Sequence, residues 1–137
     1  MAIIYNPNKK IFTLHTAHTT YQMQVDPRGY LLHLYYGEKT NSSMDYVLTY
    51  ADRGFSGNPY AAGMDRTYSL DALPQEYPSL GTGDYRNIAL NIKNEKGVES
   101  ADLLFKSYEI RSGKYQLQGL PAVWADENEA QTLEIVL

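Results

Sequence analysis

The sequence contains no cysteine, and this absence excludes several classes of protein at once. A disulfide scaffold, a thiolate metal site and a cysteine nucleophile all need a thiol. The longest apolar runs are about five residues, far short of the roughly 20 that span a bilayer. The chain turns polar directly after residues 1–5, so no secretory signal peptide is visible. These features predict a soluble, cytoplasmic protein with no membrane contact.

Positive charge is also scarce, with 12 Lys and Arg against 16 Asp and Glu and a net charge of -4. Nucleic-acid binding needs concentrated positive charge, so no nucleic-acid partner is expected. There are 3 His, of which His15 and His18 lie three apart across an expected strand end, a poor geometry for a shared metal ion. Neither a serine nucleophile elbow nor a phosphate-binding glycine loop is present. We therefore expect neither a metal nor a cofactor.

What the chain does contain is enough apolar surface for one packed domain. It has 137 residues, 43% of them hydrophobic, and 13 of them are Tyr. A chain of this length buries roughly two-thirds of its unfolded surface. Disorder of the whole chain is therefore excluded.

Period-two alternation predicts strands in the first forty residues. Residues 10–16, 20–25 and 30–36 are rich in β-forming side chains, and Tyr21, Met23 and Val25 share one face of the second segment. Residues 26–29 read Asp-Pro-Arg-Gly, which predicts a turn and hence a hairpin. Both faces of residues 30–36 are largely apolar, which predicts that this strand is covered on both sides.

The last third of the chain also has strand patterns. Alternation predicts strands at residues 88–92 and 101–105, with a β-bulge after Lys106 where the phase slips, and a final strand at residues 132–137. Residues 45–50 fit a further short strand. An amphipathic helix of 12 residues is nowhere indicated. The sequence therefore predicts an all-β, mostly antiparallel, sandwich-like fold.

Between these regions, residues 38–86 predict a long irregular loop. Loops of this length inside a small domain are uncommon unless they are functional or mobile. Apolar side chains within it indicate that it is ordered; they are Phe55, Tyr60, Tyr68, Leu70, Leu73, Tyr77 and Tyr85.

The loop contains two acid–base dipeptides, Asp52-Arg53 and Asp65-Arg66, with aromatic residues around them. Carboxylates and guanidinium groups hydrogen-bond vicinal hydroxyls, and flat rings cover the apolar face of a pyranose. The pattern is therefore typical of a sugar-binding site. The alternative interpretation is a set of exposed turn residues whose ion pairs contribute little.

Seven short motifs along the chain are specific when they are taken together. The loop motifs are Asp-Arg-Gly-Phe-Ser at 52–56, Asp-Arg-Thr-Tyr-Ser-Leu-Asp at 65–71, Gln-Glu-Tyr-Pro at 75–78 and Gly-Asp-Tyr-Arg at 83–86. Further motifs are Ile-Tyr-Asn-Pro at 4–7, Leu-Gln-Gly-Leu-Pro-Ala at 117–122 and Glu-Ala-Gln-Thr-Leu-Glu-Ile at 129–135. Together and in this order they resemble the N-terminal domain of bacterial α-galactosidases of glycoside hydrolase family 36, and the resemblance covers essentially the whole chain.

The resemblance implies a larger enzyme whose first domain is a β-supersandwich of the galactose-mutarotase type. Two further domains follow it: a barrel that carries two catalytic aspartates, and then a small β-domain. The reaction is retaining hydrolysis of terminal α-galactosides such as melibiose and raffinose. Neither barrel motif is present in this sequence. We therefore expect residues 1–137 to be an incomplete N-terminal sandwich without catalytic residues, a fragment that is inactive alone.

The resemblance also implies a role for the loop. In oligomeric relatives it reaches the active site of a neighbouring subunit, where an aspartate and an arginine help to close the galactose pocket. These match Asp52 and Arg66, which are expected to bind substrate in a homo-oligomer. The segment 57–64 between the two motifs is longer here. The alternative is a free-standing module that binds carbohydrate or protein.

Overall fold

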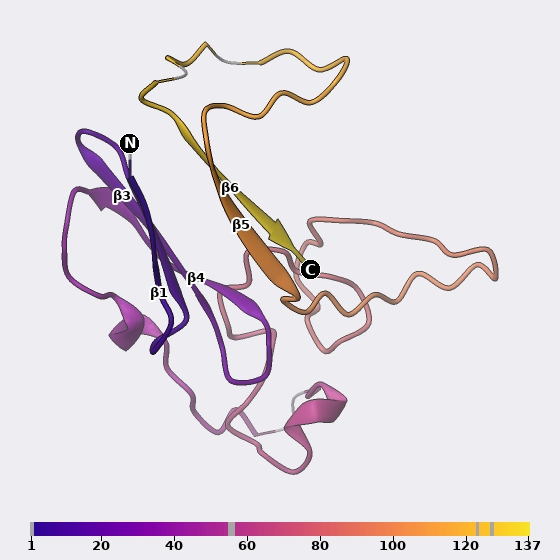
Figure 1. The fold of residues 1–137 in the computed structure, drawn as a ribbon. Helices are drawn as coiled ribbons and strands as arrows, with labels where there is room; N and C mark the ends of the chain where they lie inside the picture. Colours follow the sequence, from indigo (N-terminus) through magenta and orange to yellow (C-terminus); the bar gives the residue numbers. More distant parts are fainter. Residues whose placement is uncertain (1, 55–56, 123, 127) are drawn as a thin grey trace.

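Four strands at the start of the chain form one antiparallel sheet (Figure 1). The computed structural model describes residues 2–54, 57–122, 124–126 and 128–137. Each strand pairs with the next one along the chain, so the sheet is a meander. Its strands are β1 (Ala2–Asn6), β2 (Ile11–His15), β3 (Thr19–Val25) and β4 (Leu31–Glu38). The three strands predicted within residues 10–36 are confirmed.

A second, two-stranded sheet packs against one face of the first. Its antiparallel strands are β5 (Ser107–Ser112) and β6 (Gln131–Val136), and the latter confirms the predicted final strand. Within the described ranges the helical elements are two single-turn 3-10 helices, η1 (Asp45–Val47) and η2 (Tyr60–Ala62). The all-β, antiparallel class and the layered arrangement are thus confirmed.

The core between the sheets follows from the alternation of β2 and β3. Phe12, Met23, Val25 and Leu31 are buried there and form what we call the inter-sheet cluster. Side chains of the second sheet, among them Ile135, pack against it. The period-two pattern of β3 therefore sets which face of the first sheet the second sheet covers.

Phe12 is the aromatic centre of this core. Its ring lies 4.5 Å from that of Tyr5, 6.0 Å from that of Phe105 and 5.0 Å, edge-on, from that of Tyr108. Tilted and edge-on contacts at these distances stabilise aromatic pairs beyond the area they bury. The cluster thus joins both sheets through rings on β1, β2 and β5.

The predicted hairpin between β3 and β4 is present, and Gly29 allows its turn. The N–H of Asp26 donates to the carbonyl of Tyr30 over 2.9 Å, and the N–H of Gly29 donates to that of Asp26 over 3.1 Å. Gly29 has a φ of 94°, in the left-handed region that residues with a Cβ adopt only at a cost. The turn brings β4 back along β3.

β4 separates two cores, as its two apolar faces predict. Leu31 belongs to the inter-sheet cluster, whereas Leu32 belongs to a second group that the irregular loop supplies. We call this second group the loop cluster; it consists of Tyr30, Leu32, Ala62, Tyr68, Leu70 and Leu73. The C-terminal end of β4 is no longer covered, because the side chain of Tyr36 is 68% exposed.

Three expected strands are wrong. Residues 45–50 contain η1 instead of a strand. Residues 88–92 make a single bridge, between Leu90 and Ser79, and residues 101–105 form no strand. Side-chain alternation alone forms no ladder, because a strand also needs a neighbour with free backbone groups. The irregular segment therefore extends to residue 106, beyond the predicted boundary at 86.

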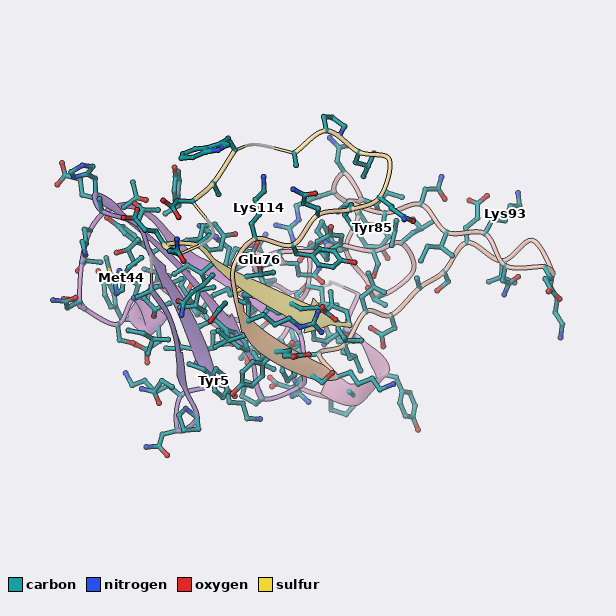
Figure 2. The ribbon with its side chains drawn as sticks, turned by 45° about the horizontal axis from the view of Figure 1, so that its top comes forward. Tyr5, Met44, Glu76, Tyr85, Lys93 and Lys114 are labelled. Carbon is teal, nitrogen blue, oxygen red and sulfur yellow. The ribbon has the colours of Figure 1, made fainter. Side chains whose placement is uncertain are left out.

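The expected bulge after Lys106 is also wrong, because β5 begins at Ser107 and pairs regularly with β6. A register shift lies instead between β3 and β4, at Gln22 and Met23. Figure 2 shows Lys93 far out on an arm of the irregular segment. A turn lies at the end of this arm, where the N–H of Gly97 donates to the carbonyl of Asn94 over 2.9 Å.

Candidate functional site

The irregular segment brings the two predicted sugar-binding residues together. Nη2 of Arg66 lies 3.2 Å from Oδ1 of Asp52, and the side chains are 64% and 50% exposed. The same Asp52 oxygen accepts a hydrogen bond from the N–H of Gly54 over 2.8 Å, which fixes the carboxylate in an Asx-type turn. The pair therefore presents a carboxylate and a guanidinium side by side to solvent.

The other members of the two dipeptides are placed differently. The carboxylate of Asp65 accepts bonds from the hydroxyl and the N–H of Thr67, and pairs with Arg28 over 3.1 Å. The bonds from Thr67, with a smaller contribution from Arg28, hold the pKa of Asp65 below its usual range. Arg53 is exposed. Asp65 thus supports the loop, while Arg66 faces Asp52.

A short closed loop leads into Arg66. The side-chain amide of Asn58 donates to the carbonyl of Asp65 over 2.8 Å, which closes residues 58–65 at their base. Arg28 contacts this loop twice, because its guanidinium also donates to the carbonyl of Ala61. Its carbon centre lies 4.6 Å above the ring of Tyr68. One arginine therefore fixes the loop by charge, by hydrogen bonding and by a cation–π contact.

The buried carboxylate of Asp26 anchors the same region. It accepts hydrogen bonds from the N–H groups of Arg28 and Tyr30, over 2.8 Å and 2.9 Å, and from the hydroxyl of Tyr68. Burial and the hydrogen bond to Asp26 raise the pKa of Tyr68 well above its ordinary value. Tyr68 stays a neutral donor and is locked beneath Arg28.

A second buried carboxylate, Asp84, holds the distal part of the loop. It pairs with Nη2 of Arg86 over 2.7 Å and accepts a bond from the amide of Gln75 over 2.8 Å. The Arg86 guanidinium also donates to the carbonyls of Leu70 and Leu73, over 2.8 Å and 2.7 Å. These bonds satisfy backbone groups that no sheet partner reaches.

The apolar residues expected to anchor the irregular loop separate into two kinds. Tyr68, Leu70 and Leu73 are buried and anchor the loop, as predicted. Tyr60, Tyr77 and Tyr85 are exposed, which contradicts their expected role as anchors. Phe55 lies outside the described residues. The supporting roles of Arg28 and Asp84 were not predicted from the sequence; the local signals were the turn motif at residues 26–29 and the Gly-Asp-Tyr-Arg motif at residues 83–86.

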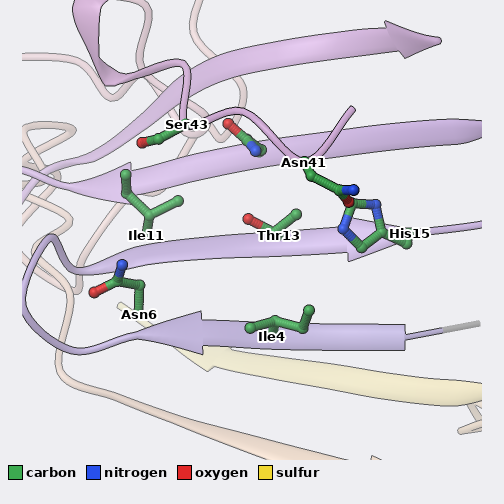
Figure 3. Close-up of a pocket in the computed structure, with 8 residues that line it drawn as sticks. Ile4, Asn6, Ile11, Thr13, His15, Asn41 and Ser43 are labelled. Carbon is green, nitrogen blue, oxygen red and sulfur yellow. The ribbon is translucent and has the colours of Figure 1, made fainter. Parts of the chain in front are cut away.

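A second candidate is a hollow of about 300 Å³ on the outer face of the first sheet (Figure 3). Its lining residues are Ile4, Asn6, Ile11, Thr13, His15, Gln22, Asn41 and Ser43. The amide of Gln22 is already used, donating to the carbonyl of Ser42 and accepting from the N–H of Met44. Nδ1 of His15 is 2.9 Å from the hydroxyl of Thr20. Asp52 and Arg66 do not line this hollow.

The charged and metal-binding chemistry of the described residues is limited. Across residues 2–54, 57–122, 124–126 and 128–137, no three His, Asp or Glu side chains are grouped to hold a metal ion. In the same part of the chain, no helix is long and apolar enough to cross a membrane. The exposed Asp52–Arg66 pair can bind hydroxyl groups, but bond cleavage in a glycoside needs two carboxylates that flank the scissile bond.

Comparison with known proteins places this geometry in a family. The family model of the glycosyl hydrolase family 36 N-terminal domain matches residues 29–137. The bifunctional alpha-galactosidase/sucrose kinase AgaSK of Mediterraneibacter gnavus is 97% identical over the whole chain, and the alpha-galactosidase AgaA of Geobacillus stearothermophilus is 42% identical. The chain covers 15% and 19% of these two proteins.

Solved structures agree with this assignment. The galactosidase domain of AgaSK superposes with a TM-score of 0.94 over 98% of this chain and 19% of its own, at 97% identity. A variant of Geobacillus stearothermophilus AgaA in complex with raffinose superposes with a TM-score of 0.84 over 92% of this chain and 18% of its own, at 41% identity. The chain therefore belongs to the family of glycosyl hydrolase family 36 N-terminal domains.

Proposed function

We propose that this chain is the N-terminal domain of a longer α-galactosidase that hydrolyses terminal α-galactosides of the melibiose and raffinose type. The named relatives are α-galactosidases, and the chain spans less than a fifth of their length. The two catalytic carboxylates of such a hydrolase then lie on another domain, and residues 1–137 are an incomplete sandwich that does not itself cleave the glycosidic bond.

We further propose that the domain takes part in a homo-oligomer and lends Asp52 and Arg66 to the galactose pocket of a neighbouring subunit. The observation that carries this proposal is their exposed 3.2 Å ion pair at the surface of a loop with buried supports. A charged pair that is half exposed contributes little to folding. Recognition of a ligand therefore explains the pair better than a contribution to stability does.

In this role Asp52 accepts hydrogen bonds from sugar hydroxyls. Arg66 donates hydrogen bonds to them or orients the Asp52 carboxylate through the charge-assisted pair. Neither residue exchanges a proton or forms a bond with the reacting carbon. Each lost charge-assisted hydrogen bond costs about 1.5–3 kcal/mol of substrate binding.

The test is steady-state kinetics of the full-length protein on melibiose and raffinose. Asp52→Ala and Arg66→Ala are each expected to lower kcat/KM by about ten- to a hundredfold, mainly through KM. Folding and oligomer size, followed on a sizing column, are expected to remain unchanged because the pair lies on a surface loop.

The matched control is another exposed arginine–carboxylate pair, that of Arg111 and Glu109 on β5, which are 2.6 Å apart. Glu109→Ala should leave the kinetics unchanged. Wild-type kinetics for both loop variants would show that the pair is an ordinary surface ion pair. Loss of the oligomer together with activity would instead assign the pair to the subunit interface.

A further inference from the structure

The closed loop of residues 58–65 presents a fully exposed aromatic side chain, that of Tyr60. Met64, near the other end of the loop, is also almost completely exposed. Large apolar side chains gathered on a surface commonly mark an interaction site. The loop therefore differs from the neighbouring segment 68–73, in which Tyr68, Leu70 and Leu73 are buried.

The exposure of Tyr60 does not come from a loose backbone. The N–H of Ala62 donates to the carbonyl of Pro59 over 2.9 Å, and the N–H of Gly63 donates to that of Tyr60 over 3.1 Å. The side chain of Ala62 is buried in the loop cluster, and the carbonyl of Ala61 accepts a bond from Arg28. These contacts hold the inner side of η2, and Tyr60 lies on its outer side.

The position of the loop connects Tyr60 to the proposed sugar site. The bond from Asn58 to the carbonyl of Asp65 closes the loop one residue before Arg66, which pairs with Asp52. Tyr60 therefore lies on the hydrogen-bonded loop that leads directly into Arg66 of the charged pair. In Figure 1, η2 lies at the outer edge of the molecule, away from β5 and β6.

We propose that Tyr60 determines specificity by contacting the sugar attached to galactose, the leaving-group side of the substrate. This inference rests on the proposed function of Asp52 and Arg66. Charged groups bind the hydroxyls of the galactosyl unit, whereas an exposed ring covers the apolar face of the next pyranose. The ligand is an α-galactoside whose leaving group is itself a carbohydrate, as in the raffinose that a relative holds in its solved structure.

The experiment compares two substrates of the full-length protein, raffinose and α-galactosyl fluoride, which has no sugar as its leaving group. Tyr60→Ala is expected to lower kcat/KM for raffinose by about two- to tenfold, the size of one aromatic contact, and to leave the fluoride unchanged. Tyr60→Phe keeps the ring and should retain wild-type values. Tyr46→Ala, which removes an exposed tyrosine on η1, is the control.

Equal effects of Tyr60→Ala on both substrates, or none on either, would overturn the inference. A smaller oligomer on the sizing column would also overturn it, by showing that Tyr60 contacts protein. Asp52→Ala tests the proposed function separately, because wild-type turnover of the fluoride by that variant contradicts the sugar-binding role of Asp52 whatever the result for Tyr60→Ala. Selective loss of raffinose turnover in Tyr60→Ala supports the ring contact.

Discussion

Asp84 shows how a single carboxylate can organise a segment without regular structure. Its side chain is 1% exposed and would lose its hydration without replacement partners. Arg86 and Gln75 supply those partners, and Arg86 connects the carboxylate to two backbone carbonyls of the loop. The negative charge is therefore compensated where it is buried.

The pKa of Asp84 reflects two opposing effects. Burial by itself raises this pKa, but hydrogen bonds from the guanidinium and the N–H of Arg86, together with its charge, outweigh burial and lower the pKa below its usual range. The folded pKa is then below the unfolded one, which is about 3.9. The ionised group stabilises the fold above that pH, and its contribution is lost as the pH falls through the lower folded pKa.

We predict that Asp84→Asn lowers the free energy of unfolding by about 2–3 kcal/mol at pH 7, because a neutral amide cannot balance the positive charge of the Arg86 guanidinium. The difference from the wild type should narrow below about pH 4, because the carboxylate of the unfolded chain is protonated there and the folded one becomes protonated as the pH falls through its lower pKa. Urea unfolding at pH 7 and pH 3 measures both values. Glu95→Gln, in an exposed turn, should show neither effect. A difference that stays constant between the two pH values would contradict the prediction.

At the scale of elements, local pattern and local structure agree best where the chain folds back on itself directly. β3, the turn after it and β4 were predictable, because alternation and the Asp-Pro-Arg-Gly turn both act within a few residues. Residues 88–92 have the same alternation, yet Leu90 makes only one bridge. What decides the outcome there is a pairing partner elsewhere in the chain, which a local pattern does not contain.

The candidate site divides in the same way. The resemblance identified Asp52 and Arg66, and the structure brings their side chains together. The contacts that support this pair were not predictable. Arg28 lies 37 residues before Asp65, in a turn motif that the hairpin between β3 and β4 already explains. Such a contact depends on tertiary packing against Tyr68.

Arg28 therefore provides a prediction for the loop as an element. Arg28→Lys keeps the charge but not the planar fork, so it is expected to lose the simultaneous contacts with Ala61, Asp65 and the Tyr68 ring. Stability should fall by about 1–2 kcal/mol. Amide hydrogen exchange should accelerate in residues 58–67 and stay unchanged in β2 and β3. Uniform acceleration across the chain would show that Arg28 acts on global stability only.

At the scale of the whole molecule, the two sheets depend on one shared core. Phe12 is fully buried and contacts rings from β1 and β5, so it joins both layers. An open hollow of about 250 Å³ also lies between the sheets and is lined by Leu14, Met23 and Ile135 among others. The contact between the two sheets therefore depends on few residues.

We predict that Phe12→Ala destabilises the chain by about 3–5 kcal/mol, because it leaves a cavity at the contact of the two sheets. Phe12→Leu should cost clearly less, since most of the volume is retained. Thermal unfolding followed by near-ultraviolet circular dichroism reports the loss of the aromatic packing. A cost below about 1 kcal/mol for the alanine variant would show that the second sheet contributes little to stability.

The meander topology of the first sheet has a consequence for the synthesis of the protein. Every pairing in that sheet joins strands that are neighbours in the chain, and the last strand is complete at Glu38. The residues that cover the two faces of β4 follow much later, with Leu70 on one face and Ile135 on the other. A ribosome adds about 5–20 residues per second. The nascent chain therefore carries a nearly complete but uncovered apolar sheet for several seconds, and in that interval it is most open to aggregation and to chaperones.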